Sequence, residues 1–214
     1  MNVVTRTEVV DVEARLAELG LTEKILHKAI AQGLLARSET TLNHPPLHAG
    51  FVTWSNTVRS LREELIPQAW DRNNESNYSR VFNPSHTMAI AVATGDENTG
   101  TQATPMTKSP KGAATSQAVE TNAAQFYFDG EGFDKIDFTN EDGSDVKTWL
   151  LMFCIAKNEV RCELSLPIAC NGKVDGWKER LVLSTIQLDP TTIDIPISPL
   201  PEMPDIEVAI SRRA

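Results

Sequence analysis

The sequence predicts an α+β protein in which N-terminal helices accompany a mainly antiparallel β-sheet. Apolar residues recur at helical spacing as far as Leu65, and after residue 78 they form short runs separated by turn signals. These patterns divide the chain into a helical N-terminal segment, residues 1–42, and an α+β main domain, residues 43–214, with a proline-rich C-terminal part.

Length and composition favour a globular, cytoplasmic protein. The chain has 214 residues, of which 41% are hydrophobic and 23% charged, so it can bury a core without disulfides. Its longest wholly apolar run, Trp149–Ala156, is far shorter than the ~20 residues of a membrane helix, and the N-terminus lacks the apolar core of an export signal. We therefore expect no membrane insertion.

The net charge and the spacing of the cysteines limit the functions that are expected for this chain. A formal net charge of -9 opposes indiscriminate nucleic-acid binding, although a local basic patch is compatible with it. Cys154, Cys162 and Cys170 are odd in number and form neither a CxxC motif nor a Cys/His pair at ligand spacing. We expect free thiols in the core or in strands, and we assign the chain no metal and no cofactor.

Two short helices are expected before residue 34. The first ends at Gly20, and the second is capped by Thr22 and ends at Gly33. The pair partly resembles a helix-turn-helix, in which Lys24, His27 and Lys28 would be the polar contacts to DNA. A helical hairpin that packs on the main domain is the simpler interpretation.

A third helix follows the break at Asn43-His44-Pro45-Pro46 and runs until Pro67. Its apolar face should lie in the core and comprises Phe51, Trp54, Val58, Leu61 and Leu65. We interpret the opposite side, which carries Arg59 and Arg62, as a solvated face.

The second half of the chain is expected to be rich in strands. Tyr78–Phe82 and Thr87–Ala93 should form one hairpin, and Trp149–Ile155 and Val160–Ile168 a second. Asn171-Gly172 then marks a turn into a third strand of an antiparallel meander. The remaining expected elements are a helix at Ala113–Ala124, a short strand at Gln125–Phe128 and a final edge strand around Ile206–Ile210.

Five stretches together carry a resemblance: the Asn43–Pro46 break with its aromatic helix, Gly95–Gly100, Lys108–Gly112, Glu163–Pro167 and Gly176–Arg180. Over roughly residues 43–210 the chain resembles proteins carried on bacterial integrative elements. The resemblance implies a mobile-element setting, where anti-defence, defence and DNA-maintenance proteins are common. It transfers no catalytic residue.

The polar segment from Gly95 to Gly112 is the longest loop of the expected domain, and long loops in compact domains tend to be functional or disordered. Just before the helix at Ala113 stand Thr107, Lys108, Lys111 and Gly112, which we assign to phosphate or nucleic-acid binding because helix N-termini attract anions. The spacing is not that of a Walker loop.

We assign contacts with a protein partner to Asp96 and Asn98 in this segment, and to Trp177 and Arg180, which we expect near an exposed hairpin end. No catalytic residue is assigned, because no serine stands in a nucleophile elbow and no histidine follows His86.

The leading hypothesis is a non-enzymatic binding or adaptor protein of a mobile element that acts in a macromolecular complex. One alternative is a nucleic-acid-binding protein that uses the N-terminal helical pair and the loop with Lys108 and Lys111. Two others are an acidic anti-defence inhibitor and an enzyme acting on a phosphorylated substrate. The patterns leave the oligomeric state open.

Overall fold

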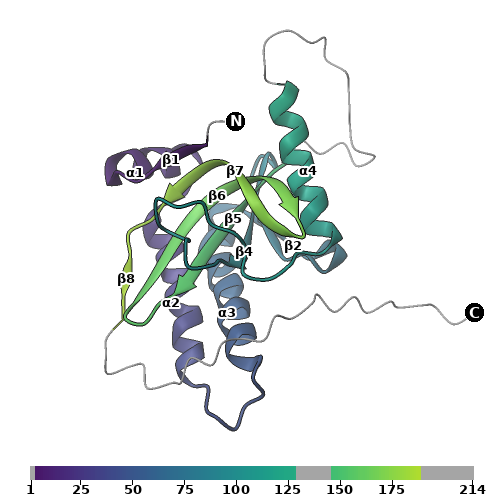
Figure 1. The fold of residues 1–214 in the computed structure, drawn as a ribbon. Coiled ribbons are helices and arrows are strands. Elements are labelled where there is room, and N and C mark those ends of the chain that lie inside the picture. The colour runs from purple at the N-terminus through teal and green to yellow at the C-terminus, as the bar shows by residue number, and fades with distance from the viewer. Residues whose placement is uncertain (1–2, 129–145, 189–214) are drawn as a thin grey trace, which may run out of the picture.

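The computed structural model describes residues 3–128 and 146–188, which form an α+β fold of four helices and an eight-stranded sheet (Figure 1). The helices are α1 (Val9–Glu18), α2 (Glu23–Ser38), α3 (His48–Leu65) and α4 (Ala113–Phe128). The strands are β1 (Val4–Arg6), β2 (Asp71–Asn73), β3 (Arg80–Phe82), β4 (Met88–Thr94), β5 (Lys147–Ile155), β6 (Glu159–Asn171), β7 (Lys173–Val182) and β8 (Ile186–Gln187). Two short 3₁₀ turns, η1 (Ile66–Gln68) and η2 (Glu75–Asn77), flank β2.

The sheet is mixed, which corrects the expectation of a mainly antiparallel one. Its order is β1-β7-β6-β5-β4-β3-β2, with β8 pairing to β6. The pairs β1–β7 and β4–β5 are parallel. Between β4 and β5 the chain passes through α4, and such a long crossover lets two strands that follow each other in sequence run in the same direction.

The expected hairpins are confirmed. β3 pairs antiparallel with β4, and β5, β6 and β7 form the antiparallel meander. In the β3–β4 turn the side-chain oxygen of Asn83 accepts hydrogen bonds from the backbone N–H groups of Thr87 and Met88, both at 2.9 Å. Gly172 turns β6 into β7 with a φ of +79°, in the region that glycine adopts most readily.

Two expected boundaries are wrong. Residues 125–128 belong to α4 and form no strand, because a short apolar run fits either periodicity. Gly33 does not end α2, which continues to Ser38. The expected strand at Ile206–Ile210 and the proline-rich stretch before it lie outside the described residues.

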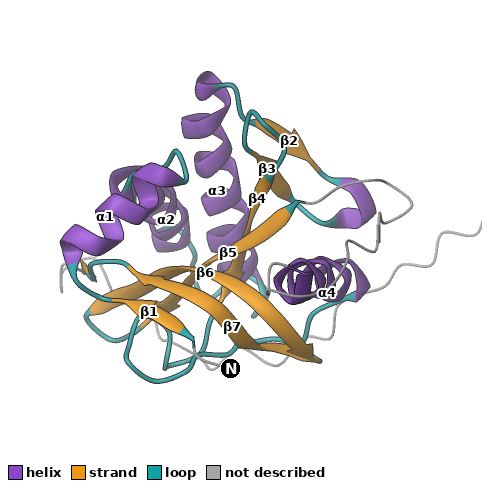
Figure 2. Cartoon of the chain, turned by 90° about the horizontal axis from the view of Figure 1, so that it is seen from above, coloured by secondary structure: helices purple, strands orange, loops and turns teal. Residues whose placement is uncertain are grey.

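Apolar side chains cover both faces of the sheet. Ile90 and Val92 of β4 belong to one core cluster, which also holds buried residues of α1, α2 and α3. Ala91 and Ala93 point to the other face, where they cluster with Val119 of α4. Figure 2 shows α1, α2 and α3 gathered on one side of the sheet.

Residues on both sides of position 42 contribute to the larger of these clusters, from Val12 and Leu26 to Leu164 and Leu181. The division into residues 1–42 and 43–214 itself stays a prediction. Among the described helices, none has both the length and the apolar character that crossing a bilayer requires.

Candidate functional site

The segment from Gly95 to Gly112 lies against the sheet and is anchored along its length by backbone hydrogen bonds. The Gly95 N–H donates to the Phe153 carbonyl at 3.0 Å, and the Thr107 N–H to the Val174 carbonyl at 3.0 Å. The Lys111 N–H donates to the Gly172 carbonyl at 2.7 Å. The longest expected loop is therefore a fixed part of the fold, tied to β5 and β7.

A buried ion pair lies beneath this segment. Glu163 of β6 and Arg180 of β7 are 0% and 2% exposed, and Nη2 of Arg180 donates to Oε2 of Glu163 at 2.6 Å. Nε of Arg180 and the Ser165 hydroxyl both donate to Oε1, at 3.1 and 2.7 Å. The antiparallel register places Ser165 directly opposite Arg180, so adjacent strands assemble the group.

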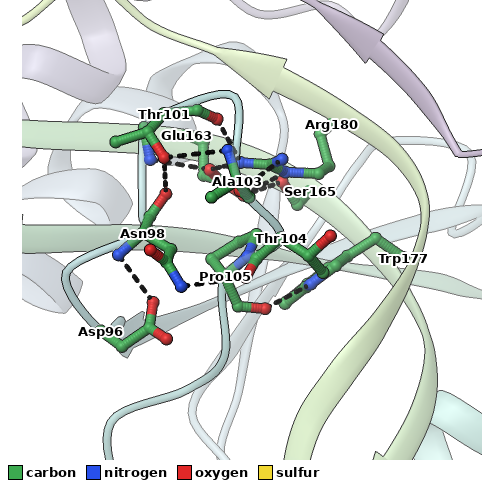
Figure 3. A network of polar contacts seen from close by, with 11 residues as sticks. Asp96, Asn98, Thr101, Ala103, Thr104, Pro105, Glu163, Ser165, Trp177 and Arg180 are labelled. Atoms are coloured by element: carbon green, nitrogen blue, oxygen red, sulfur yellow. Dashed lines mark hydrogen bonds and ion pairs between the residues drawn. The ribbon is translucent and has the colours of Figure 1, made fainter.

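This pair is joined to the segment above it (Figure 3). The Gly100 N–H donates to Oε2 of Glu163 at 2.8 Å. The Arg180 guanidinium donates to the backbone carbonyls of Thr101 and Ala103, both at 3.0 Å. Each carboxylate oxygen thus accepts two hydrogen bonds, which offsets the high cost of burying charge.

The expectation that Trp177 and Arg180 are exposed near a hairpin end is wrong. Trp177 is 2% exposed, and its indole N–H donates to the Pro105 carbonyl at 2.8 Å. Both side chains point to the face of β7 that the segment from Gly95 to Gly112 covers. A strand pattern does not reveal such a cover, because the covering residues lie more than seventy positions away.

Asp96 and Asn98 shape the first turn of the segment. Oδ1 of Asp96 accepts from the Asn98 N–H at 3.1 Å, and the Asn98 amide donates to the Thr104 carbonyl at 3.3 Å. Their assigned role in partner contact stays a prediction.

The four residues assigned to phosphate binding are brought to the start of α4. Lys108 is exposed and Lys111 is half-buried. The Thr107 hydroxyl is engaged within the chain, because it donates to the Ser109 carbonyl at 3.2 Å and accepts from the Val174 N–H at 3.1 Å. The Gly112 carbonyl accepts the first helical hydrogen bonds of α4. Phosphate binding here stays a prediction.

The expected DNA-contacting residues of the helical pair are partly engaged with neighbouring residues. Lys28 pairs with Glu64 of α3 at 2.5 Å, and His27 lies 3.4 Å from Glu23. Lys24 is exposed. The opposite face of α2, with Leu26, Ala29 and Ile30, is buried.

Glu163 and Ser165 were not among the site residues assigned from the sequence. The signal in the sequence was weak, because Arg161, Glu163 and Ser165 alternate with apolar residues along β6, a pattern typical of a strand with one solvated face. Glu163 and Ser165 are both 0% exposed beneath the segment, so the Ser165 hydroxyl is not accessible to a substrate. Among the described residues no group of three or more His, Cys, Asp or Glu side chains is placed to hold a metal ion.

These hydrogen bonds hold the segment from Gly95 to Gly112 against the sheet. The side of the segment that faces away from the sheet is therefore a fixed surface. Its exposed residues are Glu97, Gln102, Ala103, Thr104, Met106, Lys108 and Pro110. Comparisons with protein-family models, with curated proteins and with solved structures found no match to this chain.

Proposed function

We propose that the protein is a non-enzymatic binding protein, an adaptor of a bacterial mobile element, which contacts a protein partner through the exposed side of the segment from Gly95 to Gly112. The observation that carries the proposal is the buried Glu163–Arg180 pair, which binds three backbone groups of that segment. A surface held rigid before binding loses less conformational entropy when the partner docks.

The composition of the exposed side supports a protein partner. Met106, in the second half of the segment, is 42% exposed, and methionine is enriched in protein interfaces. Gln102, Thr104 and Lys108 of the same segment are also exposed, and polar residues are typical of the rim of an interface. The net charge of -9 favours a protein over a nucleic acid as the main partner.

The test is affinity purification from the native host after nuclease treatment, followed by reconstitution with each purified partner. The variant Met106→Glu with Lys108→Glu should abolish capture and reconstitution of the specific partner. Its matched control is Val10→Glu with Lys157→Glu, which likewise replaces one apolar residue and one lysine by glutamate, at exposed sites of α1 and of the β5–β6 turn. Both variants should unfold at the wild-type temperature. Equal partner binding by both variants would contradict the proposal.

A further inference from the structure

A cleft of about 390 Å³ lies on the other side of the sheet, between the second half of α3 and the edge strand β2. Its walls combine three arginines, Arg59, Arg62 and Arg72, with the apolar side chains of Trp54, Val58 and Ile66. The sequence pattern indicated only a solvated helix face here. The face is partly enclosed because β2 and Ser79 fold back over α3.

Arg62 is held in place by backbone and amide oxygens. Its Nη2 donates to the carbonyls of Asn73 and Arg80 at 2.9 and 3.0 Å, and to the side-chain oxygen of Asn74 at 2.8 Å. The Nε of Arg62 is buried and has no hydrogen-bond partner among the described residues. A guanidinium fixed in this way is suited to a planar or tetrahedral anion.

The positive charge of the cleft is only partly neutralised. Within the described part of the chain, no carboxylate forms an ion pair with Arg62 or Arg72, whereas Arg59 lies 3.7 Å from Glu63. Burial, and then the nearby charge of Arg72, lower the pKa of Arg62 from its ordinary value. The positive charges of Arg62 and Arg72 thus repel each other, in a chain whose net charge is -9. An anion bound between them would relieve this repulsion.

The apolar wall is equally well fixed. The indole N–H of Trp54 donates to the Val92 carbonyl of β4 at 3.0 Å, which holds the ring beside the cleft. Val58 lies one turn of α3 from Trp54 and also lines the cleft. An aromatic ring and an aliphatic side chain beside arginines favour a ligand that carries its anion on a compact, flat apolar group.

We infer that this cleft binds a nucleoside phosphate, either free or as the terminal nucleotide of a strand, with the phosphate on Arg62 and Arg72 and the base against Trp54 and Val58. The cavity is within the ~300–1,000 Å³ that small-molecule sites occupy. The site is separate from the segment from Gly95 to Gly112, so it goes beyond the proposed adaptor function.

Isothermal titration at low salt tests the site with nucleoside monophosphates, the corresponding nucleosides, inorganic phosphate, a short 5′-phosphorylated single-stranded DNA and a phosphotyrosine peptide. We expect a nucleoside monophosphate to bind at least about tenfold more tightly than its nucleoside or inorganic phosphate, since base and phosphate contacts add. Tighter binding of the DNA than of the mononucleotide would identify a strand end as the source of the ligand; the reverse would identify a free nucleotide.

Arg72→Ala should weaken nucleotide binding by about tenfold or more, because it removes an exposed arginine that contacts the phosphate. Arg62→Lys should also weaken it, since it keeps the charge but removes the guanidinium fork. Lys157→Ala removes one positive charge in the exposed β5–β6 turn, outside the cleft, and should leave nucleotide binding unchanged. Three results would overturn the inference: no nucleotide binding, inorganic phosphate or the phosphopeptide binding as well as the nucleotide, or nucleotide binding that Arg72→Ala leaves intact.

Discussion

Burial sets the chemistry of the Cys162 thiol. The side chain is 0% exposed in β6, and its Sγ lies 3.7 Å from the Ser184 carbonyl. Burial, and to a lesser degree the nearby carboxylates of Glu23 and Glu163, raise the pKa of this thiol from 9.0 to about 12. Because the folded value exceeds the unfolded one, the stability linked to this proton is complete below pH 9.0 and is lost as the pH rises toward about 12.

Cys162→Ala should therefore make the free energy of unfolding fall less steeply with pH in this alkaline range. The difference in slope should approach about 1.4 kcal/mol per pH unit, the value for one linked proton. Urea denaturation at successive pH values measures it. If the variant and the wild type lose stability in parallel above pH 9, the thiol ionises freely in the folded state and the assignment is wrong.

For single residues, the sequence predicted contacts between residues that are close together in the chain. The Thr22 cap is confirmed, because its side chain accepts a hydrogen bond from the Ile25 N–H at 3.4 Å. Trp177 and Arg180 were misplaced, since their burial depends on residues 101–105 folding over β7. No local pattern encodes that contact.

Gly33 illustrates how two elements approach each other. It lies inside α2, where a side-chain Cβ would meet the Thr57 hydroxyl and the backbone carbonyl oxygen of Thr53 in α3. The absent side chain thus permits close packing of α2 on α3. A glycine that ends a helix and a glycine that lets two helices pack closely look alike in sequence. This explains why the sequence pattern placed the end of α2 too early.

Gly33→Ala should destabilise the protein, although alanine favours a helix interior by roughly 1 kcal/mol over glycine. The clash with a backbone carbonyl is expected to outweigh that gain and to cost about 1–3 kcal/mol, as overpacking does. Chemical denaturation measures the difference. An increase in stability would show that α3 shifts freely and that the close approach is unimportant.

Element pairing was predictable where the turns are short. The hairpins β3–β4, β5–β6 and β6–β7 follow from alternation and turn residues. The parallel pairs β1–β7 and β4–β5 were missed, because strands far apart in sequence carry no local mark of their partner. The cleft between α3 and β2 was missed for the same reason.

In the molecule as a whole, the sequence predicted which segment of the chain forms the candidate site. It did not predict which buried side chains hold that segment in place. The length of the segment from Gly95 to Gly112 singled it out. Its anchoring depends on strand register, since only the pairing of β6 with β7 brings Glu163, Ser165 and Arg180 together beneath the segment. We therefore expect this buried group to hold the segment rigid against the sheet.

Hydrogen–deuterium exchange measures the rigidity of the segment residue by residue. In the wild type the amides of Gly100, Thr107 and Lys111 should exchange about as slowly as those of β5 and β6, because each is hydrogen-bonded to an anchored group. Ser165→Ala, expected to cost about 1 kcal/mol, and Glu163→Gln, expected to cost up to about 3–5 kcal/mol, should speed exchange around Gly100 while β5 stays protected. Exchange throughout residues 95–112 of the wild type at the rate of an unstructured chain would show that the buried group does not hold the segment rigid.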